Sequence, residues 1–174
     1  FEIDRDEDRE PSVFDMTQAA IRILQEGKGK SFVLFIENEN IDSSAHLSDV
    51  AALIQEVREF DRAVGLAYEF YKKHPQETLI LVASDHETGG LALTGAVRQI
   101  KFFGRVGRVL PSRESLERIH AIRISIRRAA RLLGKRPSPE EIDSLMAEHF
   151  KGFVLMAELR EVLLKKKRLG PTFY

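Results

Sequence analysis

The chain has 174 residues, of which 43% are hydrophobic and 31% are charged, a composition ordinary for a globular domain that is large enough to bury a core. It contains no cysteine, which excludes disulfides and thiolate zinc sites, and no apolar run near the roughly 20 residues that span a bilayer. The 27 basic and 27 acidic side chains cancel, so net charge points to no class of partner.

The amino-terminal residues 1–10 contain six acidic side chains and two arginines. They begin with Phe1 rather than Met and lack the basic and apolar regions of a secretory signal peptide. We therefore expect this chain to be a piece of a longer one. Ser12 then predicts the start of a helix, with Asp15 as its partner in a capping box and Gly27 at the end.

Two short apolar runs, residues 31–36 and 78–84, predict strands that are buried on both faces. Between them, residues 43–74 repeat apolar side chains every three or four positions, which predicts one long helix that Pro75 ends. The order strand, helix, strand favours parallel strands joined by a right-handed crossover. The expected fold class is α/β: part of a parallel sheet with flanking helices (a βαβ core), plus a mostly helical insertion.

The carboxyl-terminal half differs in composition from the first half. Residues 98–136 hold twelve Lys or Arg and only two acids. Residues 98–110 are compatible with either a short hairpin or a loop, and residues 114–133 have the apolar spacing of a helix. We therefore divide the chain into a partial α/β metal-binding core over residues 1–97 and a helical, basic segment over residues 98–174.

Carboxylates and imidazoles gather where the two predicted strands end. Asp42 and His46 follow the first strand and stand four residues apart, so a helix that begins nearby places both on one side. Asp85 and His86 directly follow the second strand, and Glu37 ends the first. Either pair alone could be explained without a metal, because strands commonly end in polar residues. Together, at converging ends of parallel strands, these ligand types predict a hydrolytic metal site.

Four stretches then carry a family resemblance: residues 11–17 (PSVFDMT), 37–46 (ENENIDSSAH), 59–64 (EFDRAV) and 85–90 (DHETGG). In this order and spacing they resemble bacterial alkaline phosphatases over roughly residues 11–91. The resemblance implies a phosphomonoester hydrolase that uses two zinc ions and a magnesium ion and forms a phosphoserine intermediate. One departure is visible, because the family's Glu-Gly-Gly-Arg-Ile-Asp reads Glu-Asn-Glu-Asn-Ile-Asp here.

The resemblance also implies a role for each candidate ligand. Glu37 is similar to the magnesium ligand, and Asp42 and His46 are similar to two ligands of the zinc that activates water. Asp85 and His86 are similar to ligands of the second zinc, which activates the nucleophile. Each zinc site therefore has an incomplete ligand set. The family's nucleophilic serine lies upstream of these residues, so we expect no catalytic residue in this chain and little turnover by it alone.

The resemblance implies a phosphate monoester substrate, bound by residues that the sequence leaves unknown, and a periplasmic or secreted location. Two further partners are expected: the missing remainder of the parent chain and, through an open sheet edge, other copies of this chain. No membrane partner is expected.

Two alternatives remain open at this point. One is another enzyme of the same superfamily, such as a phosphodiesterase or phosphomutase. The other is a non-catalytic basic interaction module centred on residues 98–136. That stretch has only Phe102 and Phe103 as aromatic residues and no groove-reading motif, so a solvated helical face is favoured over a nucleic-acid site.

Overall fold

The computed structural model describes residues 1–27, 30–91, 96–99, 106–109 and 113–165. The chain divides into two compact units, Phe1–Gly89 and Gly90–Tyr174. The boundary that the sequence predicted after residue 97 stays a prediction.

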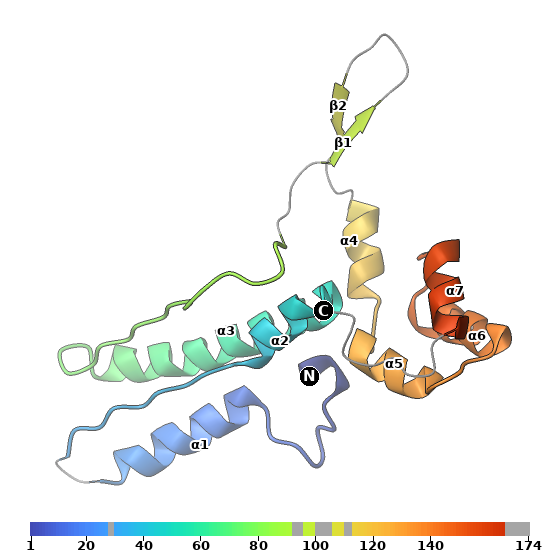
Figure 1. Ribbon diagram of the computed structural model, residues 1–174. Coiled ribbons are helices and arrows are strands. Elements are labelled where there is room, and N and C mark those ends of the chain that lie inside the picture. The colour runs from blue at the N-terminus through green and yellow to red at the C-terminus, as the bar shows by residue number, and fades with distance from the viewer. Residues whose placement is uncertain (28–29, 92–95, 100–105, 110–112, 166–174) are drawn as a thin grey trace. The chain divides into compact units, whose positions relative to one another are not determined.

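The first unit is built on helices. They are the short 3-10 helix η1 (Glu2–Asp4), α1 (Val13–Gln25), α2 (Asn40–His46) and α3 (Val50–Lys73). Helix α1 begins as the sequence predicts, since the Ser12 side chain accepts from the Asp15 N–H and Asp15 accepts from the Ser12 N–H. Helices α1 and α2 and η1 all contact α3, which is the centre of the unit (Figure 1).

The single helix predicted over residues 43–74 is wrong, because the structure divides it between α2 and α3. Ser48 adopts a left-handed backbone with φ of 51°, which an α-helix does not accommodate. Asp49 then caps α3 by accepting from the Ala52 N–H at 3.1 Å. The interruption places Asp42 and His46 on a separate short helix.

The predicted parallel sheet is also wrong, and with it the α/β fold class. Among the described residues the only sheet is an antiparallel pair of strands in the second unit. Residues 31–36 and 78–84 are extended but carry no ladder of backbone hydrogen bonds. A strand exists only where a neighbour supplies those bonds, and neither run has such a neighbour within the described part of the chain.

These two extended segments nevertheless keep the direction that a crossover connection requires. The first runs against α3, since the Phe32 ring packs at a tilt against that of Phe70 and the Asn38 side chain donates to Glu56. The second starts at the far end of α3 and returns to α2, where Thr88 bonds to Asp42 (Figure 1). Both segments therefore run the same way along α3 and end near its first turns.

The buried interior of the first unit contains small and acidic side chains rather than large apolar ones. Ala45, Ala51, Ala52 and Ala63 are buried, as are the carboxyl-bearing Asp49, Glu56 and Glu59 of the α3 region. Small residues let the helices approach closely. Glu56 and Glu59 accept hydrogen bonds from Glu2 and Phe14 outside α3, while Asp49 accepts from Ala52 within α3.

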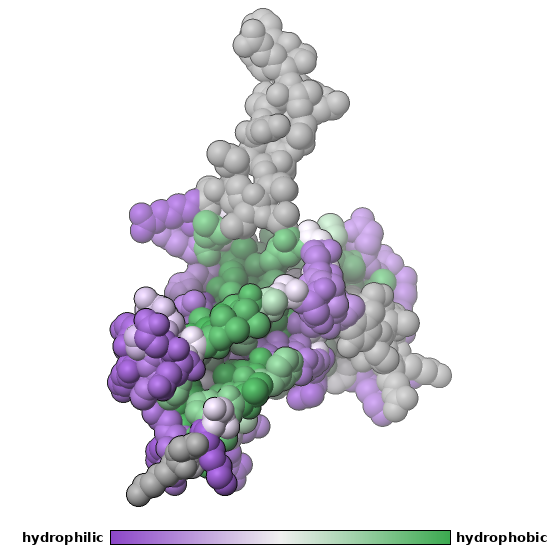
Figure 2. All heavy atoms as spheres, turned by 90° about the vertical axis from the view of Figure 1, so that its left-hand side faces the viewer, coloured by the Kyte–Doolittle hydropathy of each residue, from purple (hydrophilic) through white to green (hydrophobic). Residues whose placement is uncertain are grey.

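A large apolar face of the first unit is left uncovered. Val33 and Phe35 are 95% and 85% exposed, and Leu79 and Leu81 are 80% and 83% exposed. Helices α1 and α3 add further exposed apolar residues, among them Met16, Ile23, Ile54, Val57 and Tyr68. Figure 2 shows hydrophobic side chains gathered over a broad area of the face seen there. Exposed patches of this extent indicate a surface that binds another polypeptide.

The second unit has a hairpin and four helices in the described residues. Strands β1 (Ala96–Gln99) and β2 (Val106–Val109) pair antiparallel, with Ala96 opposite Val109. The helices are α4 (Arg113–His120), α5 (Ile126–Leu133), α6 (Pro139–His149) and α7 (Ala157–Lys165).

The one helix predicted over residues 114–133 is likewise two helices. Ser125 is fully buried and caps α5 by accepting from the Arg128 N–H, while Arg123 donates to the His120 carbonyl at the end of α4. Helix α6 begins with a reciprocal capping box between Ser138 and Glu141.

Candidate metal centre

Asp42 and His46 form the first pair of candidate ligands. Both lie on α2, one helical turn apart, and the His46 Nε2 atom is 3.4 Å from Asp42 Oδ2. The Asp42 side chain is 37% exposed and that of His46 is 55% exposed. Asp42 and His46 therefore lie on one side of a helix, as their spacing predicted, and solvent reaches both side chains.

Asp85 and His86 form the second pair, at the end of the second extended segment. The His86 Nε2 atom is 3.4 Å from Asp85 Oδ2, and the other carboxylate oxygen accepts from the His86 backbone N–H at 3.0 Å. Ser84 donates to the His86 carbonyl at 2.8 Å. The Asp85 and His86 side chains therefore lie next to each other at the end of this segment.

Thr88 connects the two pairs. Its hydroxyl donates to Asp42 Oδ1 at 2.5 Å and lies 3.1 Å from His86 Nδ1. The loop after the second segment and the helix after the first therefore meet at this one side chain, across 46 residues of sequence.

Gly89 allows this meeting. Its φ is 77°, and a Cβ atom at this position would lie 2.3 Å from the Ala45 carbonyl oxygen. Only a residue without a side chain fits both the backbone conformation and the space. The adjacent Gly90 also has positive φ, of 66°, but a Cβ there would meet nothing within 4 Å.

Glu37 is exposed and directly follows the first extended segment. Among the described residues, no three or more His, Asp or Glu side chains are placed to hold one metal ion. The structure thus brings the two pairs together through Thr88, and it does not gather Glu37 with them into one ligand cluster.

The distance within each pair fits a zinc ion. Two ligand atoms bound about 2.0–2.1 Å from a tetrahedral zinc lie about 3.3–3.4 Å apart. The Nε2–Oδ2 separations are 3.4 Å in both pairs. Carboxylate oxygen with neutral imidazole nitrogen is also a donor set that zinc accepts. Each pair therefore fits two corners of a tetrahedral site, with its other corners open to solvent or to further ligands.

Glu56 holds the chain next to Glu37. Its Oε1 accepts from the Glu2 N–H at 2.6 Å, its Oε2 accepts from the Asn38 side chain at 3.2 Å, and its backbone carbonyl accepts from the same amide at 3.0 Å. Burial raises the pKa of Glu56, although the bonds from Glu2 and Asn38 oppose the shift.

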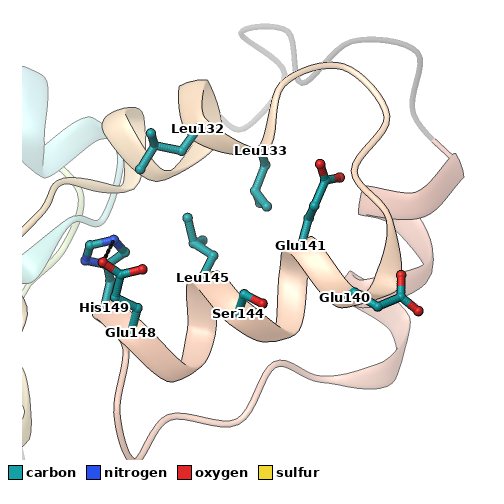
Figure 3. Close-up of a pocket in the computed structure, with 8 residues that line it drawn as sticks. All are labelled: Leu132, Leu133, Glu140, Glu141, Ser144, Leu145, Glu148 and His149. Atoms are coloured by element: carbon teal, nitrogen blue, oxygen red, sulfur yellow. Dashed lines mark ion pairs between the residues drawn. The ribbon is translucent and has the colours of Figure 1, made fainter.

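The second unit has a shallow hollow of about 370 Å³ between α5 and α6. Figure 3 shows Leu133 and Leu145 turned toward each other there, with Glu140 directed away. His149 lies 3.5 Å from Glu148 in an ion pair. The hollow has an apolar floor and an acidic rim without polar groups that converge on one point, so it lacks the features of a catalytic site.

Sequence reasoning missed Thr88, Glu56 and Glu59. Thr88 was part of the Asp-His-Glu-Thr-Gly-Gly motif, but nothing in the sequence said that its hydroxyl reaches Asp42. Glu59 is buried, accepts from the Phe14 N–H and pairs with Arg62 at 2.7 Å. Residues 56 and 59 stand one turn apart on α3, the spacing that places both on one helix face.

Comparison with known proteins gives one consistent family. The sequence model of the alkaline phosphatase family matches residues 1–106. The repressible alkaline phosphatase of Saccharomyces cerevisiae is 36% identical over 102 residues, which are 56% of this chain and 18% of that protein. Alkaline phosphatase 4 of Bacillus subtilis is 41% identical over 91 residues, which are 52% of this chain and 19% of that protein.

A solved structure agrees with these sequence relatives. The crystal structure of Thermus thermophilus alkaline phosphatase superposes with a TM-score of 0.73 at 29% identity, over 94% of this chain and 33% of that one. The chain thus spans about a fifth of the length of the curated relatives and a third of the solved structure.

Proposed function

Since this chain belongs to the alkaline phosphatase family, we propose that it is the metal-binding portion of a phosphomonoester hydrolase. Asp42 and His46 would contribute two ligands to one zinc ion, Asp85 and His86 two ligands to a second, and Glu37 one ligand to magnesium. When bound, the zinc ions would supply Lewis acidity for activating an oxygen nucleophile and stabilising the leaving oxygen of a phosphate ester.

The observation that carries this proposal is the 3.4 Å separation of imidazole nitrogen and carboxylate oxygen in both pairs. Two independent surface ion pairs would not be expected to share a hydrogen-bonding partner. Here the pairs are linked by Thr88 and by the close approach of Gly89 to Ala45.

The proposal includes low activity of this chain by itself. Each zinc would hold two protein ligands from residues 1–174 rather than the three that catalytic zinc sites use. The rest of an alkaline phosphatase fold would supply the remaining ligands and would cover the apolar face formed by Val33, Phe35, Leu79 and Leu81.

The proposed substrate is a phosphate monoester, and the proposed location is periplasmic or secreted. Among the described residues, no helix combines the length and the apolar character needed to cross a bilayer. One relative, from Bombyx mori, is named a membrane-bound alkaline phosphatase, and that property is not proposed for this chain.

Zinc titration by calorimetry tests the proposal on the full chain. We expect two zinc ions to bind, one to be lost in Asp42→Ala, one in Asp85→Ala, and both in the double variant. Asp61→Ala removes an exposed carboxylate from α3 and serves as the matched control. Absence of zinc binding to the wild-type chain, or equal binding by the double variant, would overturn the ligand assignment.

An activity assay tests the second part of the proposal. With zinc and magnesium present, the chain alone should release no p-nitrophenol from p-nitrophenyl phosphate above the buffer rate. Turnover that Asp42→Ala abolishes would show that these residues already form a complete active site.

A further inference from the structure

The Thr88 hydroxyl has two polar neighbours, and each belongs to a different ligand pair. Asp42 Oδ1 lies 2.5 Å away and His86 Nδ1 lies 3.1 Å away. Thr88 and Asp42 are half-buried, whereas His46, Asp85 and His86 are exposed. A single hydroxyl thus stands between the two pairs.

The chemistry of the three groups fixes the direction of both hydrogen bonds. An ionised carboxylate only accepts, so the one Thr88 proton is donated to Asp42 Oδ1. The contact between the Thr88 oxygen and His86 Nδ1 is then a hydrogen bond only if His86 donates it, which requires a proton on Nδ1. The Glu87 carbonyl, 3.3 Å from Nδ1, is a second acceptor that demands the same proton.

This direction leaves the ligand atoms in the state that a metal requires. With its proton on Nδ1, a neutral His86 presents a free electron pair at Nε2, the atom that faces Asp85 Oδ2 at 3.4 Å. With Oδ1 occupied by Thr88, Asp42 presents Oδ2, the atom that faces His46 Nε2 at 3.4 Å. Thr88 thus leaves His86 Nε2 available beside Asp85, and Asp42 Oδ2 available beside His46.

We propose that Thr88 is a positioning residue that selects the His86 tautomer and the Asp42 carboxylate oxygen used for metal binding, so that one hydroxyl prepares both zinc sites. This inference rests on the proposed function. A bond between Thr88 and Asp42 alone would only attach the loop to α2. The additional contact with the imidazole ring distinguishes a positioning role from an attachment.

The experiment uses the full 174-residue chain, first without metal. The ¹⁵N chemical shifts of the two His86 ring nitrogens report the tautomer at about pH 8.5, where an ordinary imidazole is neutral. Wild type, Thr88→Ser and the control Ser84→Ala should hold the Nδ1–H form, because Ser84 bonds only to the His86 backbone carbonyl. Thr88→Val, which keeps the shape and loses the hydroxyl, should give a mixture of tautomers.

Zinc affinity is measured on the same four proteins by competition with a chelator. Thr88→Val should bind about 10–100-fold more weakly, the usual cost of losing a group that orients a metal ligand, while Thr88→Ser and Ser84→Ala should bind like wild type. Equal affinity and equal tautomer in Thr88→Val would overturn the proposal.

Two other outcomes are also decisive. A wild-type His86 that carries its proton on Nε2 overturns the proposal without any variant, which covers the case in which Thr88→Val fails to fold. If the wild-type chain binds no zinc, the proposed function fails, and the tautomer comparison still decides whether Thr88 positions the ring.

Discussion

The helices and the extended segments of the first unit differ in what they need from the rest of the chain. Helix α3 is complete within its own sequence, with Asp49 as its cap and its hydrogen bonds made four residues apart. Residues 31–36 and 78–84 are equally apolar, but their backbone groups can be paired only by another strand. The structure therefore forms the helices and leaves the two segments extended along α3 without a sheet.

The candidate metal centre depends on both kinds of region. Asp42 and His46 are placed by a helix, and Asp85 and His86 by the end of an extended segment. Thr88 and Gly89 join the two by direct contact with α2. Within the described residues, the two loops therefore meet without a hydrogen-bonded sheet beneath them.

The largest expected effect is on association through the uncovered segments. We expect the wild-type chain to self-associate at micromolar concentration, because exposed apolar strands are templates for pairing between chains. The double variant Val33→Lys/Leu81→Lys places one charge on each extended segment. It should give a monomer in sedimentation velocity experiments. The double variant should stay folded, since both side chains are more than four-fifths exposed.

A matched control adds the same charge elsewhere. Gln25→Lys with Gln76→Lys changes two exposed positions outside the segments and should leave the association unchanged. A wild-type chain that sediments as a monomer at all concentrations would contradict the inference that these segments seek a partner.

The next effect concerns the contact between the two loops. Gly89→Ala forces a Cβ to within 2.3 Å of the Ala45 carbonyl oxygen and strains a left-handed backbone, whereas Gly90→Ala adds only the strain. The backbone strain costs about 1–2 kcal/mol in each variant, and the clash should add about 1–3 kcal/mol to the first. Urea unfolding measures the difference between the two alanine variants.

Amide chemical shifts then show where the change occurs. Gly89→Ala should shift the resonances of Ala45 and Thr88 strongly, while Gly90→Ala should affect mainly its own neighbours. Equal destabilisation by the two substitutions would mean that the loop does not rest on α2.

Much of the local structure was predictable from sequence, because it depends on residues that are close together in the chain. The same dependence separates the helices from the extended segments. The Ser12–Asp15 and Ser138–Glu141 caps, and the placing of Asp42 with His46 and of Asp85 with His86, all depend on residues within four positions of each other. The missing sheet was not predictable, because an apolar run specifies an extended chain but not the presence of a neighbour. The contact of Thr88 with Asp42 spans 46 residues and has no local signal.

A third prediction concerns the acid that ties the first extended segment to α3. Burial raises the pKa of Glu56 above its ordinary value of 4.5, so the folded chain binds this proton more tightly than the unfolded chain. Its contribution to stability is therefore complete below about pH 4.5 and is lost as the pH rises through the raised pKa. Glu56→Gln keeps an oxygen that accepts from the Glu2 N–H and removes the titration.

The measurement compares the free energy of unfolding of wild type and Glu56→Gln in urea at a series of pH values. The wild type should lose stability relative to the variant as the pH rises above about 4.5 and reach a plateau above the raised pKa. A difference that is constant with pH would show that Glu56 is not desolvated in the folded chain.

The smallest effect tests whether a purely local motif has the same value in both units. Ser12→Ala and Ser138→Ala each remove one half of a capping box, and an N-cap serine contributes about 0.5–2 kcal/mol. Ser12 is buried and Ser138 is half-buried, so Ser12→Ala also removes a buried hydroxyl that makes two hydrogen bonds to Asp15. We expect a loss of about 1 kcal/mol in urea unfolding for Ser12→Ala and about half of that for Ser138→Ala. If both substitutions lower the free energy of unfolding equally, burial of the Ser12 cap adds nothing to its stabilising effect. Each helix start would then depend on its own first turn alone, unlike the extended segments, which need a neighbouring strand.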